Sequence, residues 1–251
     1  IIDLNNNANK IFYNDHYAFL FNGEIYNIET LKKKYLGNHK FQTKTDTEIL
    51  FQLLINFGSN IIKELEGMFA FTFIDKLNSK IFLCRDFTGI KPLYYFNNNC
   101  GFFFSSEAWF LYSLSSKELD YGACKFYFNH GFSPENSTLI KNVHKVLPGS
   151  ILTYDFKNNK KVTEHFFHLS TAKTNNKFLK TKDLIKDVIK KNLISDTKVG
   201  IFLSGGLDSS ILAVTAKNLG LEVEAYTSYF LPENKFKKFN VDFKYADKLS
   251  K

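Results

Sequence analysis

Two stretches near the start of the chain place their apolar residues at a helical period. Ile28–Tyr35 predicts a short helix and Ile49–Phe57 predicts a longer one. Thr45 and Glu48 stand before the second stretch at the spacing of a capping box, and Gly58 follows its last apolar residue, which suits a helix end. The first part of the chain is therefore expected to hold two consecutive helices.

From Gly67 onward the pattern changes to short runs of β-branched and aromatic residues, separated by turn residues such as Asp75, Asn78 and Gly89. One helical stretch, Asp120–Asn129, interrupts the series. The expected strands are Met68–Ile74, Ile81–Cys84, Leu93–Phe96, Phe102–Ser105, Ile151–Asp155 and Val162–Phe167. Strands that follow one another in this way favour an antiparallel sheet, and with the preceding helices they make an α+β arrangement.

The last part of the chain alternates helices and strands. After a polar stretch that is typical of a linker, the expected elements are helix Thr181–Leu193, strand Val199–Leu203, a helix through Ile211, strand Glu222–Phe230 and helix Asn240–Leu249. This order indicates a parallel sheet, which binds its ligand at the carboxyl ends of the strands. We therefore expect one domain at 1–168, a linker at 169–177 and a second domain at 178–251.

The composition argues against several classes of protein. The chain has 251 residues, of which 44% are hydrophobic and 17% aromatic, so it is globular rather than disordered. No apolar run approaches the roughly 18 residues of a membrane-spanning helix. The net charge of +8 would suit a nucleic-acid-binding protein. However, the lysines are scattered among Asn, Ile and Phe, which is the composition expected of a coding sequence rich in A and T. We expect no membrane and no nucleic acid partner.

The cysteines and the first residues carry two further expectations. Cys84, Cys100 and Cys124 form no C-x-x-C pair and are odd in number, which suits free thiols in a reducing cytoplasm. Cys84 stands in an apolar run, where a buried thiol is expected. The only methionine is Met68, and Ile1–Leu4 is typical of the middle of a strand and turn. The natural start is therefore expected upstream of Ile1.

The segment Val199–Ser210, VGIFLSGGLDSS, joins an apolar strand to a helix through a glycine turn. Such a junction aims backbone N–H groups and the positive end of a helix dipole at one point, and glycines let an anion approach it. Asp208 stands where a Walker lysine would be expected, and an acid beside phosphates suits Mg²⁺. The alternative without a ligand is an ordinary strand-to-helix turn with Ser204 as the N-cap.

This loop resembles the pyrophosphate loop of the ATP pyrophosphatase superfamily, whose members split ATP between its α and β phosphates. The resemblance implies ATP and Mg²⁺ as cofactors, with Asp208 beside the metal ion. The residues that it assigns to ATP are Leu203, Ser204, Gly205, Gly206, Asp208, Ser209 and Ser228.

Five motifs follow one another in the first part of the chain. They are NGEIYN at 22–27, TDTE at 45–48, GMFAF at 67–71, RDFTGIKPLYY at 85–95 and SSE at 105–107. Taken alone, Asn22-Gly23 favours a hairpin turn with Glu24 in solvent, and Asp46 suits the first turn of a helix.

Two of these motifs contain charged residues that also allow a plain structural interpretation. Arg85 and Asp86 suit a surface ion pair, which would contribute roughly 0–1 kcal/mol. Glu107 is either an acid at a helix start or an interface residue.

Together, the ordered motifs resemble the class II glutamine amidotransferase domain of glutamine-hydrolysing asparagine synthetases. The resemblance covers Ile1 to about Glu107, and SGGLDSS extends it to a second domain. It implies an α+β N-terminal-nucleophile (Ntn) sandwich followed by an incomplete α/β parallel-sheet ATP pyrophosphatase domain.

The resemblance also implies roles for single residues. The Asn22 side chain and the Gly23 N–H would form the oxyanion hole, and Glu24 and Asp46 would bind the α-ammonium group of glutamine. Ile1 and Ile2 would contribute backbone contacts. The family's nucleophile is an N-terminal cysteine whose own α-amine is the base, and this residue is expected before Ile1. An internal cysteine has no free α-amine and cannot replace it.

The function implied is that of an ATP-dependent carbon–nitrogen ligase, a cytoplasmic asparagine synthetase. Glutamine hydrolysis would supply ammonia to an aspartyl-adenylate, giving asparagine, glutamate, AMP and pyrophosphate. A homodimer is the family's common form. Two alternatives stay open at this point: a related enzyme that amidates another carboxylate, such as a sugar acid in surface-polysaccharide synthesis, and a non-catalytic amidotransferase-like binding protein.

Overall fold

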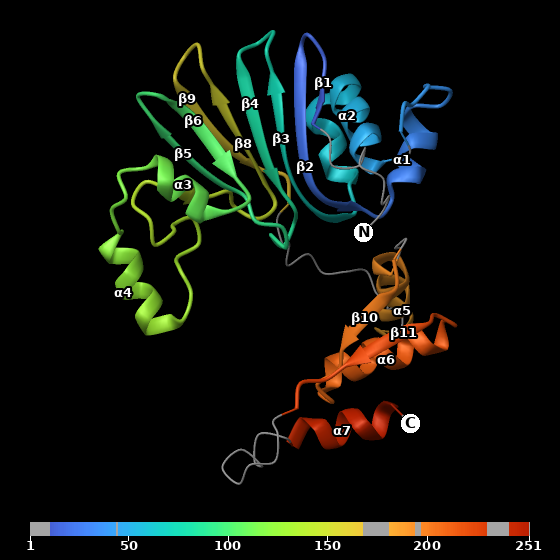
Figure 1. Cartoon of the computed structure of the whole chain (residues 1–251). Helices are drawn as coiled ribbons and strands as arrows, with labels where there is room; N and C mark the ends of the chain where they lie inside the picture. The colour runs from blue at the N-terminus through green and yellow to red at the C-terminus, as the bar shows by residue number, and fades with distance from the viewer. Residues whose placement is uncertain (1–10, 44, 168–180, 194–196, 230–240, 251) are drawn as a thin grey trace. The chain divides into compact units, whose positions relative to one another are not determined.

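A computed structural model describes residues 11–43, 45–167, 181–193, 197–229 and 241–250 (Figure 1). The chain divides into two compact units, and the described residues of the first lie between 11 and 167, those of the second between 181 and 250. Ile1, Ile2 and the expected linker at 169–177 lie outside the described residues. Within the described ranges, no helix is long and apolar enough to span a membrane.

The first unit contains two antiparallel sheets. The six-stranded sheet has the order β1 (Phe12–Tyr13), β2 (Tyr17–Ile25), β3 (Gly67–Asp75), β4 (Lys80–Arg85), β8 (Ser150–Asp155) and β9 (Lys160–His165). The three-stranded sheet has the order β6 (Gly101–Ser105), β5 (Tyr94–Asn98) and β7 (His144–Lys145). All pairs of neighbouring strands are antiparallel, as the strand pattern predicts.

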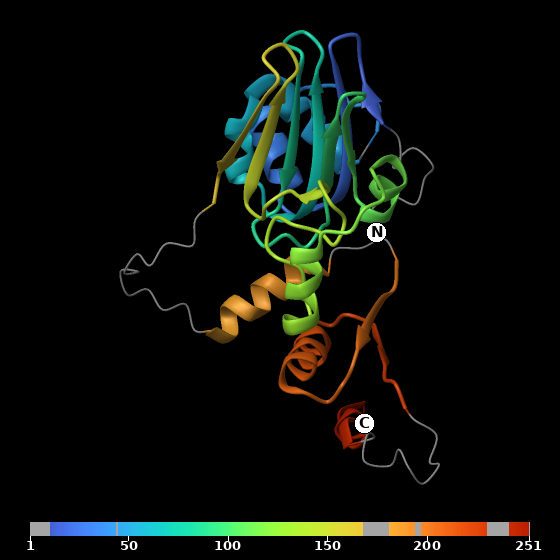
Figure 2. The ribbon, with the colours of Figure 1, turned by 90° about the vertical axis from the view of Figure 1, so that its left-hand side faces the viewer.

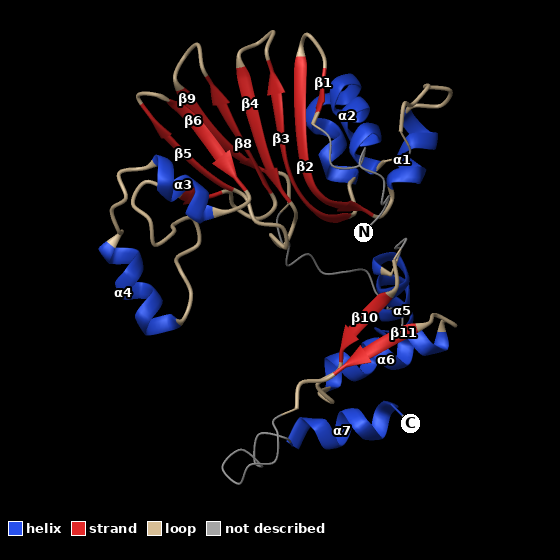
Figure 3. Ribbon diagram, viewed as in Figure 1, coloured by secondary structure: helices blue, strands red, loops and turns tan. Residues whose placement is uncertain are grey.

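The helices of the first unit lie in two groups (Figure 3). One group packs against the six-stranded sheet and consists of α1 (Ile28–Tyr35), α2 (Asp46–Phe57) and the 3₁₀ helix η1 (Gly58–Glu64). Figure 2 shows α1 and α2 on one face of that sheet. The other group, α3 (Ala108–Leu114) and α4 (Tyr121–His130), follows the hairpin of β5 and β6.

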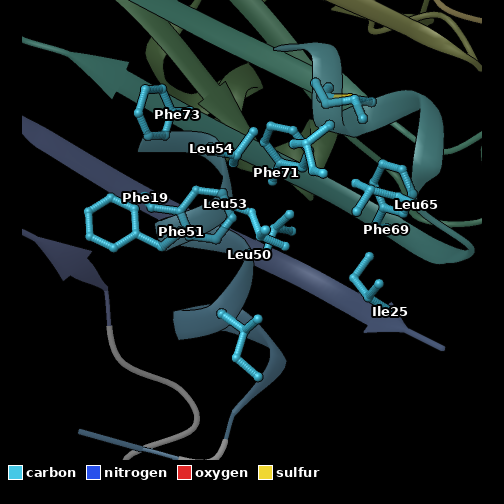
Figure 4. Close-up of a cluster of buried hydrophobic side chains, with 14 of the residues drawn as sticks. Phe19, Ile25, Leu50, Phe51, Leu53, Leu54, Leu65, Phe69, Phe71 and Phe73 are labelled. Carbon is cyan, nitrogen blue, oxygen red and sulfur yellow. The ribbon is translucent and has the colours of Figure 1, made fainter. Parts of the chain in front are cut away.

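Strand alternation divides the apolar side chains between two cores. Phe19, Phe69 and Phe71 face α2, where they pack with Leu50 and Leu53 (Figure 4). The alternate positions of the same sheet pack on the other side, in a second core formed by Ala70, Ile81, Leu83, Leu93, Tyr95, Val146 and Leu152. The first unit is therefore a layered α+β sandwich of helices, large sheet and small sheet.

The Asn22-Gly23 turn was a wrong prediction, because both residues lie inside β2. In the ladder with β3, Asn22 pairs with Ala70 and Gly23 pairs with Phe69. Nine paired residues outweigh the local preference of an Asn-Gly dipeptide for a turn. Glu24 is half-buried rather than solvated.

Arg85 and Asp86 do not form a surface ion pair. Asp86 is 1% exposed, and its carboxylate accepts hydrogen bonds from the backbone N–H groups of Phe69, Thr88, Ile90 and Lys91. The Arg85 guanidinium donates to three carbonyl oxygens, those of Gly89, Lys91 and Val146. The two side chains therefore satisfy the backbone polar groups of the loop after β4.

The second unit contains a two-stranded parallel sheet and three described helices. In chain order these are α5 (Thr181–Asn192), β10 (Val199–Phe202), α6 (Leu207–Asn218), β11 (Val223–Tyr226) and α7 (Val241–Ser250). The parallel pairing confirms the prediction from the order of strands and helices. Both strands end at the loop that carries the glycines, so the loop lies at the carboxyl edge of the sheet.

Candidate functional site

The backbone N–H of Gly23 points to an open edge of β2. The N–H and C=O of Phe69, which lies opposite Gly23, are both bonded to Asp86, at 3.2 Å and 2.8 Å. Gly23 and Phe69 are therefore a non-hydrogen-bonded pair, and the N–H of Gly23 points away from β3. On that side β1 pairs with Ala18 and Phe19 only, so within the described residues no strand faces Gly23.

Two carboxylates lie at the same edge. The N–H of Ile25 points in the same direction and donates to Asp46 Oδ2 at 3.2 Å. Burial raises the pKa of Asp46, and the negative charge of Glu24 raises it further, so the two acidic groups are close enough to interact. Two neighbouring carboxylates of this kind favour a bound cation, and an ammonium group is such a cation.

Asn22 presents its amide on the adjoining face of the sheet. Its Nδ2 donates to Ser106 Oγ at 3.3 Å, and both residues line a pocket of about 230 Å³ between β2, β3 and the hairpin of β5 and β6. The structure therefore brings Gly23, Glu24 and Asp46 to one strand edge and places the Asn22 amide beside it. Ser106 is a neighbour of the site that the sequence did not assign to it.

The backbone of β3 lies close to Gly23. Its φ is +151°, and a Cβ at this position would lie 2.1 Å from Met68 O and 2.6 Å from Phe69 Cα. These are backbone atoms of a paired strand and cannot move aside. Glycine is therefore required here for close packing of the two strands as well as for φ.

Replacing Asp46 by asparagine should stabilise the fold and, by the role that the family resemblance implies for this residue, weaken glutamine binding. The raised pKa means that the native chain binds this proton more readily than the unfolded chain, so the ionised group opposes folding at pH 7. In D46N, the free energy of unfolding should rise at pH 7, and the gain should vanish as the pH falls through the pKa of Asp46. The KM for glutamine should rise about ten-fold or more.

The measurement pairs urea unfolding between pH 4 and pH 7 with glutaminase kinetics on the protein expressed from the complete gene. Asp15→Asn changes an exposed acid in the turn between β1 and β2 and serves as the control. A D46N protein with unchanged KM would show that Asp46 does not hold the substrate.

The second candidate site is the loop between β10 and α6. Gly205 has φ +77°, and Gly206 is the N-cap of α6, with no side-chain cap. Ser204 is not the N-cap, which corrects the alternative interpretation of the sequence. Its Oγ instead accepts from Gly206 N at 3.3 Å and shares a 3.0 Å hydrogen bond with Ser209 Oγ.

The start of α6 offers free donors to an anion. The first intrahelical bond runs from Ser210 N to Gly206 O, so the three preceding N–H groups have no intrahelical acceptor. Asp208 is exposed in this first turn. Because Mg²⁺ beside nucleotide phosphates takes few protein ligands, one exposed carboxylate at this place fits it. Among the described residues, no group of three or more His, Cys, Asp or Glu could hold a metal ion.

Leu203 and Ser228 lie at the same end of the parallel sheet. Leu203 N donates to Tyr226 O at 2.8 Å, and Thr227 Oγ1 donates to Leu203 O at 2.5 Å. Ser228, which is exposed, follows directly. Helix α7 also contributes, because a Cβ at Gly205 would lie 2.6–2.9 Å from its atoms. Nothing in the sequence pattern predicted that this helix supports the loop.

Known proteins share both parts of the chain. Residues 1–167 match the family model of the glutamine amidotransferase domain, and residues 180–251 match that of asparagine synthase. "Asparagine synthetase [glutamine-hydrolyzing] 1" of Bacillus subtilis (strain 168) is 35% identical over 238 residues, which are 92% of this chain and 37% of that protein. "Putative asparagine synthetase [glutamine-hydrolyzing] 2" of Methanocaldococcus jannaschii is 35% identical over 220 residues, 82% of this chain and 42% of that protein.

A solved structure, the glutamine phosphoribosylpyrophosphate amidotransferase of B. subtilis with ADP and GMP, matches this chain with a TM-score of 0.42 and 18% identity. The match covers 93% of this chain and 53% of that chain. The chain spans about two fifths of the length of the two curated relatives.

A layered α+β sandwich, followed by a parallel-sheet unit with a glycine loop between strand and helix, is an Ntn amidotransferase fold joined to part of an ATP pyrophosphatase fold. With two thirds of its length in the first family match, this chain belongs to the glutamine amidotransferase domain family, and an asparagine synthase domain follows in the same chain.

Proposed function

We propose that this chain acts in glutamine-dependent asparagine synthesis, with aspartate as the acceptor. The observation that carries the proposal is the combination of the two sites on one chain. An open Gly23 N–H beside two carboxylates suits glutamine, and the glycine loop at the start of α6 suits the phosphates of ATP. A glutamine site does not by itself imply an ATP site, and an ATP site does not imply a glutamine site, so the combination of the two supports the proposal.

In the first unit, Glu24 and Asp46 bind the α-ammonium group of glutamine. The Gly23 N–H and the Asn22 amide donate to the oxyanion that forms when the substrate amide is attacked. The family resemblance implies an N-terminal cysteine as the nucleophile, with backbone contacts from Ile1 and Ile2. Cys84 cannot substitute, because it is fully buried and burial raises the pKa of its thiol well above the ordinary value. When the oxyanion collapses, the C–N bond breaks and ammonia leaves with the proton taken from the nucleophile, and water then hydrolyses the resulting thioester to glutamate.

In the second unit, the backbone of the glycine loop and the serine hydroxyls bind the phosphates of ATP, while Leu203 and Ser228 lie beside the nucleoside. Asp208 would hold Mg²⁺, which would neutralise phosphate charge. The aspartate carboxylate attacks the α phosphate and displaces pyrophosphate, because an acyl-adenylate is a far better electrophile than a carboxylate. Ammonia attacks the acyl carbon and AMP leaves, which gives asparagine.

The proposal also includes the cellular compartment, the oligomeric state and the partners of the enzyme. The free thiols of Cys84, Cys100 and Cys124 support a reducing cytoplasm. A homodimer that acts only on small molecules, with no nucleic acid, is what the family resemblance implies.

The test is pyrophosphate release from ATP by the protein expressed from the complete gene, with ammonia supplied directly and with or without aspartate. Ammonia bypasses the first site, so only the second unit is tested. Aspartate-dependent release with asparagine formed is the expected result. A protein that binds Mg-ATP but does not respond to aspartate would contradict the assignment of the acceptor.

A further inference from the structure

Glu48 is a buried carboxylate whose bonds all go to the segment before α2. It is 5% exposed, and its oxygens accept from Gln42 N at 2.8 Å, from Thr43 N at 2.5 Å and from Thr43 Oγ1 at 2.6 Å. A buried carboxyl group that accepts three hydrogen bonds holds its donors firmly in place. The segment that it holds leads directly into the helix of the candidate site.

The bonds around Glu48 continue to the N-cap of α2. Thr45 Oγ1 accepts from Glu48 N at 3.3 Å, which is one half of the predicted capping box. The other half differs, because the Glu48 carboxylate reaches back to residues 42 and 43 instead of to Thr45 N. Thr43 Oγ1 completes the network, since it shares a 2.8 Å hydrogen bond with Thr45 Oγ1 and accepts a hydrogen bond from Thr45 N at 3.3 Å.

Asp46 is the next residue after this N-cap, and its own hydrogen bonds are long. Ile25 N donates to it at 3.2 Å and Thr47 Oγ1 donates at 3.3 Å. Burial raises the pKa of Asp46, so ionisation of this side chain is unfavourable where it lies. Because two of the hydrogen bonds to Asp46 are long, the position of its carboxylate also depends on the N-cap that precedes it in the chain.

We propose that Glu48 is a positioning residue that fixes the Asp46 carboxylate at the edge of β2 and thereby sets the affinity of the site for an α-ammonium group. The inference rests on the proposed glutamine site. It predicts that Glu48 acts on substrate binding through Asp46, although Glu48 itself points away from the edge toward the segment at 42–43.

Glu48→Gln tests the proposal in the protein expressed from the complete gene. Glutamine keeps the shape of the side chain, but one of its two end groups can no longer accept from a backbone N–H. The KM for glutamine should rise about ten-fold, kcat should change less than two-fold, and ammonia-dependent asparagine formation should stay at the wild-type rate. Thr43→Val, which removes one donor to Glu48, should give a smaller rise and covers the case in which E48Q does not fold.

Asp75→Asn is the matched control. Asp75 is also a buried carboxylate that orders a turn, since it accepts from Asn78 N at 2.9 Å and from Asn78 Nδ2 at 2.7 Å. It lies at the far end of β3, opposite Tyr17 rather than Gly23. D75N should lower thermal stability and leave the KM for glutamine unchanged.

The double variant D46N/E48Q separates the proposal from a merely structural role. If Glu48 acts through Asp46, the double variant should have the KM of D46N alone. If the effects of D46N and E48Q on the KM for glutamine instead multiply in the double variant, the two residues act independently and the inference is overturned. A normal KM in both E48Q and T43V would also overturn it. If D46N itself leaves the KM for glutamine unchanged, the glutamine site has been misassigned. That result contradicts the proposed function and is distinct from a failure of the role given to Glu48.

Discussion

Replacing Gly23 by alanine should destabilise the first unit and abolish glutamine hydrolysis. The new Cβ would lie 2.1 Å from Met68 O and 2.6 Å from Phe69 Cα, so β2 and β3 would have to separate. Forced overlap of paired backbone atoms should lower the free energy of unfolding by more than about 3 kcal/mol. It should also move the Gly23 N–H away from the substrate. Urea unfolding and glutaminase activity measure the two effects.

Gly101→Ala is the matched control for this prediction. Gly101 also has φ +151°, but the nearest atoms to its Cβ position belong to the Phe103 ring, at 3.9 Å. The φ cost alone should be about 1 kcal/mol, with glutaminase activity retained. Equal losses in the two variants would show that backbone strain, and not the close approach of β3, explains the requirement for glycine.

Replacing Gly205 by alanine should remove the ATP-dependent reaction and leave glutamine hydrolysis intact. The added Cβ would lie 2.6 Å from Tyr245 Cβ, 2.8 Å from Asp242 O and 2.9 Å from Ala246 N, all of them in α7. Either the loop or the helix must shift, and the N–H groups at the start of α6 then lose their alignment with the phosphates. Aspartate-dependent ATP–pyrophosphate exchange should fall about 100-fold or more.

Gly220→Ala isolates the contribution of backbone conformation. Gly220 has φ +74°, close to the φ of +77° at Gly205, and nothing lies within 4 Å of its Cβ position. G220A should lose about 1 kcal/mol of stability and keep its exchange activity. An active G205A protein would contradict the role of the loop, and an inactive G220A protein would mean that strain alone explains the loss.

Most of the strands and helices could be predicted because local pattern and final structure agree. Helix α1 has the predicted bounds, Gly58 ends α2, and β8 begins one residue before its predicted start. The longest element that the sequence did not predict is β2, where an Asn-Gly turn was expected instead. The other unpredicted elements are short: the 3₁₀ helix η1, α3 and the two-residue strands β1 and β7. Elements of this length have too few residues to show a period, and packing against the rest of the unit decides them.

The candidate sites were predictable by residue type but not by geometry. From the local sequence, Asp46 was expected to be an ordinary acidic residue in the first turn of a helix. Its hydrogen bond with Ile25 joins residues 21 positions apart, and local sequence patterns do not predict such a contact. The Asn22-Gly23 turn failed because pairing with a distant strand decides the conformation there. From the sequence, Glu48 was recognised only as part of a capping box, because its burial and its hydrogen bonds to residues 42 and 43 are visible only in the structure.

The central claim is that one protein uses the amide nitrogen of glutamine to make asparagine. The direct test supplies the protein from the complete gene with glutamine labelled with ¹⁵N in its amide, together with aspartate and Mg-ATP. The label should appear in the side-chain amide of asparagine, with one AMP and one pyrophosphate formed per asparagine. Labelled ammonia without labelled asparagine, while ATP is bound, would contradict the account.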